Sequence, residues 1–159
     1  MQVILGKTAM LFEAATEAGA ILADASTEAQ EGLRLYGLHL GTAFQLIDDV
    51  MDYLSTAEEM GKNVGDDLAE DKCTLPLIHA MREGTEEQRL LVRQAIRKGG
   101  LDDLQPIMEI VKATGAIEYT QQKAQEEADK AIAALDALAD SSFKDTLIQL
   151  ADIAVKRKR

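Results

Sequence analysis

Three aspartates stand inside an apolar segment, Phe44–Asp52, and this segment constrains the chain more than any other. Asp48 and Asp52 are four residues apart, so on a helix they share one face, with Asp49 about 100° around the axis. Like charges at this spacing repel by about 0.2–0.5 kcal/mol on an exposed helix, and by more where water is excluded. Ionised carboxylates among apolar neighbours need a partner, and a hard divalent cation is one. The segment therefore predicts an α-helix that carries a candidate Mg²⁺ site.

The composition favours helices along the whole chain. The 159 residues include two prolines and 4% aromatic residues, while alanine, leucine, glutamate and glutamine are abundant; this mixture favours helix. The helices predicted from apolar periodicity are residues 3–23, 27–54, 76–82, 85–98, 101–114, 116–138 and 141–156. No run of residues is typical of a strand. We therefore predict an all-α helical bundle that forms a single domain over residues 1–159.

Capping residues predict where two of these helices begin. Either Ser26 or Thr27 can cap the long helix that contains the aspartates, and Thr27 and Gln30 have the spacing of a capping box. Thr85 and Gln88 have the same spacing at the start of a later helix.

Three glycines, Gly32, Gly37 and Gly41, lie inside the long helix. Glycine in a helix interior costs about 1 kcal/mol relative to alanine. We explain these glycines by close packing of the long helix against its neighbours.

Charge and cysteine content exclude several classes of protein. A formal net charge of −11 argues against nucleic-acid binding, which needs a basic face. Cys73 is the only cysteine, so no disulfide forms within the chain, and this is typical of a reducing cytosol. No stretch of about 18 uncharged apolar residues predicts a transmembrane segment. The first seven residues lack the pattern of a signal peptide, and we expect a cytoplasmic protein.

Other polar residues surround the aspartates in the sequence. Gln45 precedes Asp48 by one helical turn, and Lys62 and Lys72 flank the acidic pair at residues 66–67. Carboxylates for a cation and ammonium groups for phosphate oxygens are the components of a diphosphate site. Two plainer interpretations stay open. Asp48 and Asp52 can form a solvated face, and the lysines can pair with neighbouring acids in surface ion pairs worth about 0–1 kcal/mol.

The complete pattern resembles a known family. Its elements are Gly6-Lys7-Thr8, Phe44-Gln45-x-x-Asp48-Asp49-x-x-Asp52, Gly61-Lys62, Asp67-Leu68 and Lys72-x-Thr74-Leu75-Pro76. They resemble the Lys-Thr motif and the second aspartate-rich region of trans-isoprenyl diphosphate synthases, the polyprenyl synthetases. The sequence is most similar to the long-chain branch of this family, which includes the bacterial octaprenyl diphosphate synthases. The resemblance covers nearly all 159 residues. Asp71 departs from the pattern, because long-chain members more often have glycine before the lysine.

A larger departure is that only one of the family's two aspartate-rich motifs is present. Asp102-Asp103 is followed by no third acid in register. The upstream Gly-Lys and Arg-Arg elements, which the family uses for its two diphosphate substrates, are also missing. The chain therefore resembles the C-terminal half of an isoprenoid synthase fold.

The resemblance implies a prenyltransferase of isoprenoid biosynthesis. The complete enzyme would condense isopentenyl diphosphate with an allylic diphosphate in a Mg²⁺-dependent reaction. The implied metal-binding residues are Asp48, Asp49 and Asp52, directly or through water. The implied substrate-binding residues are Lys7, Thr8, Gln45, Lys62 and Lys72, of which all but Lys72 are also implied in catalysis.

Half of an active site is expected to be inactive or very weak alone. The chain is then either a piece of a polyprenyl diphosphate synthase or a non-catalytic half-length subunit that pairs with a chain carrying the first motif. A purely structural helical domain is a third reading. We expect a homodimer or an association with the missing N-terminal half, because a partial bundle exposes apolar surface.

Overall fold

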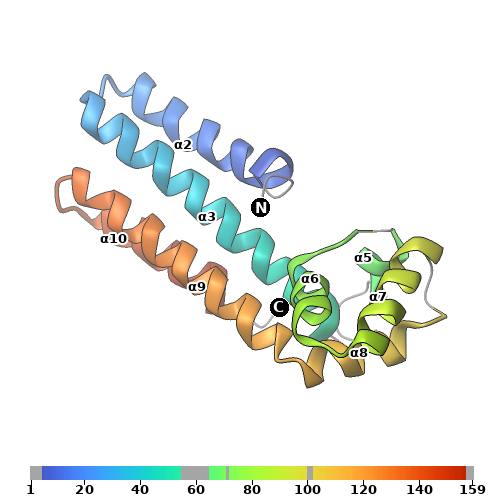
Figure 1. Ribbon diagram of the computed structural model, residues 1–159. Helices are drawn as coiled ribbons and strands as arrows, with labels where there is room; N and C mark the ends of the chain where they lie inside the picture. The colour runs from blue at the N-terminus through green and yellow to red at the C-terminus, as the bar shows by residue number, and fades with distance from the viewer. Residues whose placement is uncertain (1–4, 55–64, 71, 100–101, 157–159) are drawn as a thin grey trace. The chain divides into compact units, whose positions relative to one another are not determined.

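The computed structural model describes residues 5–54, 65–70, 72–99 and 102–156, and every regular element within them is a helix. The α-helices are α2 (Met10–Leu22), α3 (Thr27–Leu54), α5 (Asp66–Ala69), α6 (Leu75–Glu83), α7 (Glu86–Lys98), α8 (Leu104–Ala113), α9 (Ala116–Ala134) and α10 (Ser142–Lys156), as Figure 1 shows. A π-helical turn, Leu5–Ala9, precedes α2, and a 3₁₀ turn, Leu135–Ala137, follows α9. The predicted all-α class is confirmed.

The chain forms two compact units. The first comprises residues 1–47 and 123–158, and the second comprises residues 48–122. Helix α3 contributes to both units, and so does α9. The single domain expected from the length stays a prediction. No helix in the described part of the chain has a long enough apolar window to cross a membrane.

The core of the first unit forms around Tyr36 of α3. Its ring is buried with Ala131, Leu135 and Ala151, which come from α9, the 3₁₀ turn and α10. The Tyr36 hydroxyl donates a 2.8 Å hydrogen bond to the carbonyl oxygen of Leu147. This bond joins α3 to α10 through a side chain that is 1% exposed.

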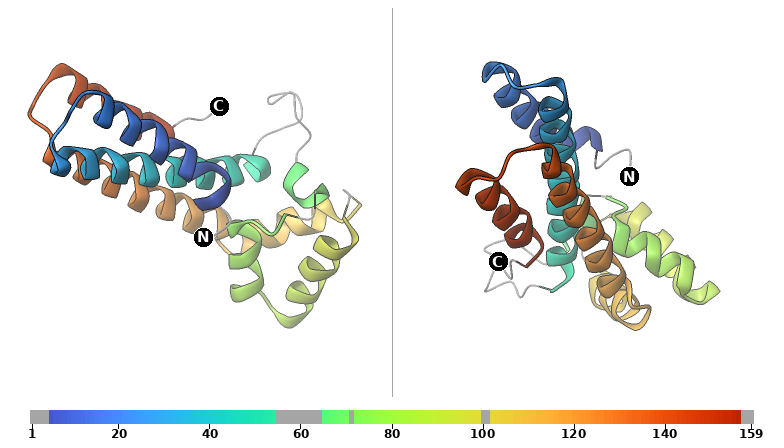
Figure 2. Two further views of the ribbon diagram at one scale, coloured as in Figure 1. Left: turned by 90° about the horizontal axis from the view of Figure 1, so that it is seen from above. Right: turned by 90° about the vertical axis from the view of Figure 1, so that its left-hand side faces the viewer.

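Helices α2 and α3 lie side by side in the first unit, as the views of Figure 2 confirm. A Cβ atom added at Gly37 would overlap the Thr16 hydroxyl and lie 2.5 Å from the carbonyl oxygen of Phe12. At Gly41 it would lie 2.8 Å from Ala9 Cα. Real Cβ atoms do not approach other atoms so closely, so both positions need glycine.

Gly32 serves the same purpose on another side of α3. A Cβ atom there would lie 2.7 Å from the carbonyl oxygen of Ala134, at the end of α9. The close helix packing predicted for all three glycines is therefore confirmed.

Polar side chains also join the helices of the first unit. Arg34 of α3 forms an ion pair with Glu13 of α2. His39 Nδ1 lies 2.7 Å from Glu127 Oε2, which connects α3 to α9. Burial raises the pKa of Glu127, but the hydrogen bonds from Lys130 and His39 together lower it by more. The pKa of Glu127 therefore lies below its usual value. His39, which has no metal-ligand spacing in the sequence, is thus a packing residue.

The start of α3 differs from the predicted capping box. Ser26 Oγ accepts a 3.2 Å hydrogen bond from the backbone N–H of Ala29, so Ser26 is the cap. Gln30 donates to the carbonyl oxygen of Ala25 and does not pair with Thr27 as predicted. The capping box of Thr85 and Gln88 forms as predicted, with bonds of 2.9 and 3.2 Å in both directions.

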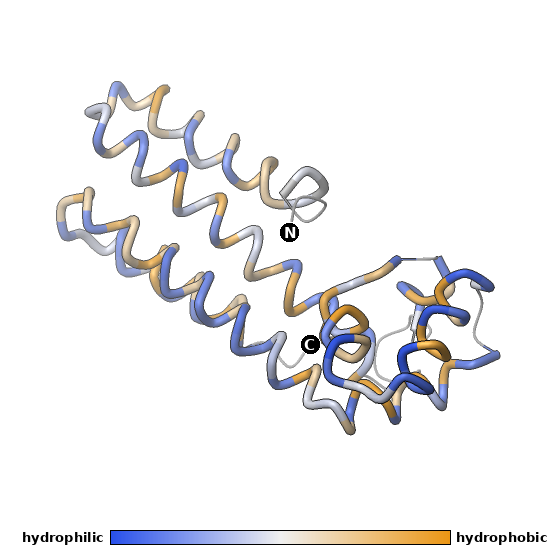
Figure 3. The backbone as a smooth tube through the Cα atoms, in the orientation of Figure 1, coloured by the Kyte–Doolittle hydropathy of each residue, from blue (hydrophilic) through white to orange (hydrophobic). Residues whose placement is uncertain are grey.

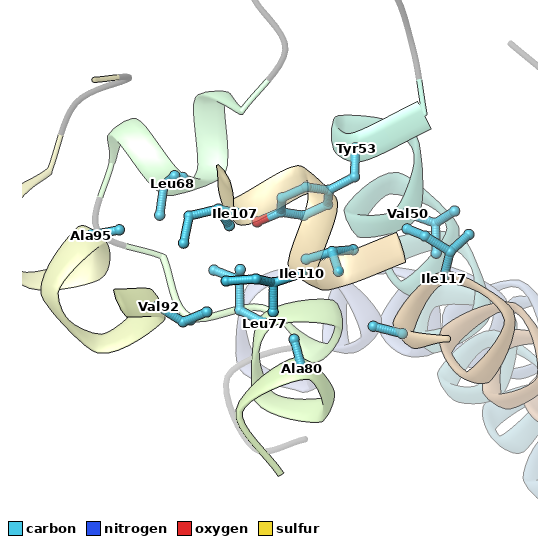
Figure 4. Packing of buried hydrophobic residues seen from close by; sticks show 12 residues of the cluster. Val50, Tyr53, Leu68, Leu77, Ala80, Val92, Ala95, Ile107, Ile110 and Ile117 are labelled. Atoms are coloured by element: carbon cyan, nitrogen blue, oxygen red, sulfur yellow. The ribbon is translucent and has the colours of Figure 1, made fainter. Parts of the chain in front are cut away.

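The second unit has a larger apolar core. Its buried members are Val50, Tyr53, Leu68, Leu77, Ala80, Val92, Ala95, Ile107, Ile110, Val111, Ala116 and Ile117. Figure 4 shows how side chains from α3, α5, α6, α7 and α8 converge in this cluster. Apolar residues recur once per turn along α7 and α8, with polar residues between them, as the colouring of Figure 3 shows. Periodic burial of this kind is what makes these short helices stable.

Two buried hydroxyl groups lie in this core. Neither Tyr53 Oη nor Thr74 Oγ1 has a hydrogen-bond partner of acceptable geometry within the described residues. Figure 4 shows the Tyr53 oxygen pointing into the cluster, towards Ile107. Burial raises the pKa of Tyr53 above its usual range, and the neighbouring Thr74 hydroxyl opposes this rise only in part. Both groups carry a desolvation cost that no bond of acceptable geometry within the described residues offsets.

The glycine packing predicts opposite effects of one substitution at two positions. Gly37→Ala should lower the free energy of unfolding by about 1–3 kcal/mol, because overlap with α2 outweighs the better helix propensity. Gly19→Ala on α2, where nothing lies within 4 Å of the added Cβ, should raise it by up to about 1 kcal/mol. Urea denaturation of both variants tests this. Stabilisation by Gly37→Ala would contradict the close packing.

The two buried tyrosines supply a second matched pair. Tyr36→Phe should lower the free energy of unfolding by about 1 kcal/mol, because the bond to Leu147 is lost. Tyr53→Phe should leave it unchanged or raise it by about 1 kcal/mol, because the buried hydroxyl that is removed has no partner of acceptable geometry among the described residues. Thermal unfolding measures both effects. A loss at Tyr53 as large as that at Tyr36 would mean that the Tyr53 hydroxyl is bonded.

Candidate diphosphate and metal site

The three aspartates of α3 lie in different environments. Asp48 is exposed, whereas Asp49 is 3% and Asp52 is 8% exposed. Leu46 and Val50, in the same stretch of α3, are also buried. The alternative of a solvated face at Asp48 and Asp52 is therefore wrong for Asp52. Asp48 is the one that a bound cation can reach from solvent.

Asp52 is bonded to the segment that follows the described end of α3. Its carboxylate Oδ2 accepts a 3.2 Å hydrogen bond from the backbone N–H of Asp67. Its backbone carbonyl accepts a second bond, also 3.2 Å, from the N–H of Gly65. Burial is the largest cause that raises the pKa of Asp52, to about 6. The charges of Asp67 and Asp66 add to this rise, while backbone bonds from the same residues oppose it.

Lys72 is held by the acids of the same segment. Its ammonium group lies 2.6 Å from Glu70 Oε2 and 3.3 Å from Asp67 Oδ1. These contacts raise the pKa of Lys72, so it is a cation at neutral pH. The open alternative, in which Lys72 pairs with nearby acids, therefore describes its contacts in this structure. Its side chain remains partly exposed, at 37%, so its charge can still act on an anion.

Two other predicted residues are in contact in the first unit. The Thr8 hydroxyl donates a 2.7 Å hydrogen bond to the Gln45 side-chain oxygen. This bond joins the turn that precedes α2 to α3 and orients the Gln45 amide. Lys7 lies in that turn, but its side chain is outside the described residues, as is all of Lys62.

The donor set restricts how a metal ion could bind. No group of three or more His, Cys, Asp or Glu side chains in the described segments is arranged to hold one. Mg²⁺, however, commonly binds through one or two carboxylates and takes its other oxygens from substrate phosphates and water. The exposed Asp48 carboxylate fits that second arrangement. These residues therefore suit a cation that arrives with a diphosphate better than a cage made of protein ligands alone.

Two structural features of the site were not predicted from the sequence. One is the short helix α5, which lies between the predicted helices 27–54 and 76–82. The other is Asp67, whose backbone N–H contacts Asp52 and whose carboxylate contacts Lys72. The glycine before the acidic pair, Gly65 with φ of 84°, is the signal that could have indicated a tight turn into a helix.

Comparisons with known proteins agree on a single family. The polyprenyl synthetase model matches residues 1–113. Octaprenyl diphosphate synthase of Escherichia coli (strain K12) is 55% identical over 160 residues, which cover 100% of this chain and 50% of that protein.

Two solved structures resemble the chain closely. Polyprenyl synthase from Caulobacter crescentus CB15, complexed with calcium and isoprenyl diphosphate, has a TM-score of 0.91 and 42% identity, covering 99% of this chain and 48% of that one. Geranylgeranyl pyrophosphate synthase from Corynebacterium glutamicum, complexed with isoprenyl diphosphate and magnesium, has a TM-score of 0.87 and 29% identity, covering 98% and 45%. The chain spans about half the length of the curated relatives it matches.

The raised pKa of Asp52 predicts a pH-dependent effect of Asp52→Asn when a chelator removes divalent cations. Because the folded state binds the proton more tightly than the unfolded chain, wild type loses stability as the pH rises from 3.8 to about 6. Asparagine does not titrate, so the variant does not lose unfolding free energy at this position as the pH rises. Relative to wild type, Asp52→Asn should gain up to about 3 kcal/mol in unfolding free energy between pH 4 and pH 7. Urea denaturation at both values measures the difference, and a difference that does not change with pH would contradict it.

Proposed function

Because the chain belongs to the polyprenyl synthetase family, we propose that it supplies the second aspartate-rich half of a polyprenyl diphosphate synthase. The complete enzyme would condense isopentenyl diphosphate with an allylic diphosphate to extend an isoprenoid chain. The observation that carries this proposal is the exposed Asp48 carboxylate on α3, with a lysine-bearing segment attached to the same helix at Asp52. That combination offers a cation ligand and a cation for phosphate oxygens within one compact unit.

The reaction requires charge to be neutralised on a departing diphosphate. A bound Mg²⁺ would supply that electrostatic stabilisation. The described relatives with calcium or magnesium and isoprenyl diphosphate support a divalent cation and a diphosphate ligand here. In this chain Asp48 would hold the cation, with Asp49 and Asp52 buried behind it.

The remaining roles follow from side-chain chemistry and from the resemblance. Lys72, and by resemblance Lys7 and Lys62, would bind diphosphate oxygens as point charges. The Thr8 hydroxyl fixes the Gln45 carbonyl oxygen by donating to it. A carbonyl dipole held in place in this way can stabilise positive charge on an allylic carbon without having to reorient. Thr8 is therefore proposed to position Gln45 for that role.

A second candidate function is a non-catalytic half-length subunit that pairs with a chain carrying the first aspartate-rich motif. Large apolar side chains exposed on α2 and α10 favour such a partner; Leu11 is 74%, Leu22 is 86% and Phe143 is 81% exposed. Light scattering of the chain with a protein carrying that motif separates the candidates. A stable complex without condensation activity favours the subunit, whereas an active complex favours the synthase half.

The proposed cation role of Asp48 predicts a loss of ligand binding. Asp48→Asn should weaken Mg²⁺-dependent binding of inorganic pyrophosphate by at least about tenfold, because a charged oxygen ligand is removed. Asp129→Asn is the matched control, since Asp129 is also an exposed aspartate in a helix interior, and it should leave binding unchanged. Isothermal titration calorimetry measures both. Equal binding by wild type and Asp48→Asn would contradict the proposed site.

A further inference from the structure

The N-cap residue of helix α5 has no side chain that could accept a hydrogen bond from the first turn. This residue is Gly65, which adopts a left-handed conformation. The first N–H groups of any helix lack partners within the helix and need an acceptor from elsewhere. Serine, threonine, aspartate or asparagine at the N-cap normally supplies that acceptor.

Asp52 of α3 takes the place of the missing cap. The N–H of Asp67, the second residue of α5, donates to Asp52 Oδ2 at 3.2 Å, which is the bond that an N-cap side chain would otherwise accept. The N–H of Gly65 donates to the Asp52 carbonyl oxygen at 3.2 Å. Both contacts are shielded from water, because Asp52 is 8% exposed.

Asp67 extends this connection to Lys72. Its carboxylate lies 3.3 Å from the Lys72 ammonium nitrogen, and its carbonyl oxygen accepts a 2.8 Å hydrogen bond from the Lys72 backbone N–H. Asp67, which Asp52 holds through its N–H, thus contacts the backbone of Lys72 and shares the Lys72 ammonium group with Glu70.

We propose that Asp52 is a positioning residue, which caps α5 and through Asp67 sets the place of Lys72, and is not a direct ligand of the metal. This inference rests on the proposed function, because it concerns the cation and the lysine of the same site. It divides the aspartates of α3 into two roles. Asp48 faces the cation, and Asp52 holds the segment that carries the phosphate-binding charge.

Asparagine distinguishes the two roles at position 52. Its amide oxygen caps a helix about as well as a carboxylate does, but it is a much poorer ligand for a hard cation because it has no charge. A capping role therefore tolerates Asp52→Asn and not Asp52→Ala. A ligand role tolerates neither.

The test compares the wild-type chain with Asp52→Asn, Asp52→Ala and Asp48→Asn. Mg²⁺-dependent binding of inorganic pyrophosphate is measured by calorimetry, and amide hydrogen exchange of residues 65–69 is measured by NMR. We expect Asp52→Asn to bind within about threefold of wild type, and Asp52→Ala to bind at least about tenfold more weakly. The Asp67 amide should stay protected in Asp52→Asn and exchange faster in Asp52→Ala.

The outcomes separate this inference from the proposed function. If Asp52→Asn binds as weakly as Asp48→Asn, Asp52 is a ligand; the inference is then wrong and the proposed function stands. If Asp52→Ala binds like wild type, positioning by Asp52 is also ruled out. If Asp48→Asn binds like wild type, or the wild-type chain itself does not bind, the proposed site is wrong. Hydrogen exchange then tests the capping role of Asp52 by itself. Equal protection of the Asp67 amide in the two Asp52 variants would overturn that role.

Discussion

The hydrogen bond from the Asp67 backbone to the Asp52 carboxylate joins the two stretches of the second unit that carry polar chemistry. Without it, the N–H of Asp67 would lose its acceptor. The segment that carries Lys72 would then be attached to α3 only by the bond from the Gly65 N–H to the Asp52 carbonyl and by apolar packing. With it, the lysine and the aspartates belong to one structure. The bond also places a carboxylate among buried neighbours and other acids, which is why the pKa of Asp52 rises to about 6. The bond that orders the backbone at the start of α5 thus involves a carboxylate whose pKa is raised.

Helix α3 can carry such a carboxylate because its two ends are fixed by apolar packing. In the first unit, glycine contacts hold α2 against α3, and the buried Tyr36 joins α3 to α10. In the second unit, Val50 and Tyr53 enter a core shared with five other helices. Mutational cost is therefore expected to be large at these contacts and small at exposed helix positions. The polar residues of the site depend on that framework and contribute little to it.

The helices were predictable where the signal is local. The capping box at Thr85 formed because both partners lie within one turn. Helix α5 was not predictable, because four residues carry no periodicity and its cap comes from Asp52, fifteen residues earlier in the chain. The burial of Asp49 was also hidden, since helical spacing gives the face of a residue but not what covers that face. The aspartate pattern indicated the chemistry, whereas the division of roles among the aspartates required tertiary contacts.

We propose that a divalent cation and a diphosphate bind together at Asp48 on α3. Titrating the ¹⁵N-labelled chain with Mn²⁺, a paramagnetic substitute for Mg²⁺, in the presence of inorganic pyrophosphate tests this most directly. We expect the amide signals around Asp48 to broaden most strongly. This broadening should require pyrophosphate and should be absent in Asp48→Asn. Broadening that is centred on another acidic cluster, or that is unchanged in Asp48→Asn, would contradict cation binding at Asp48.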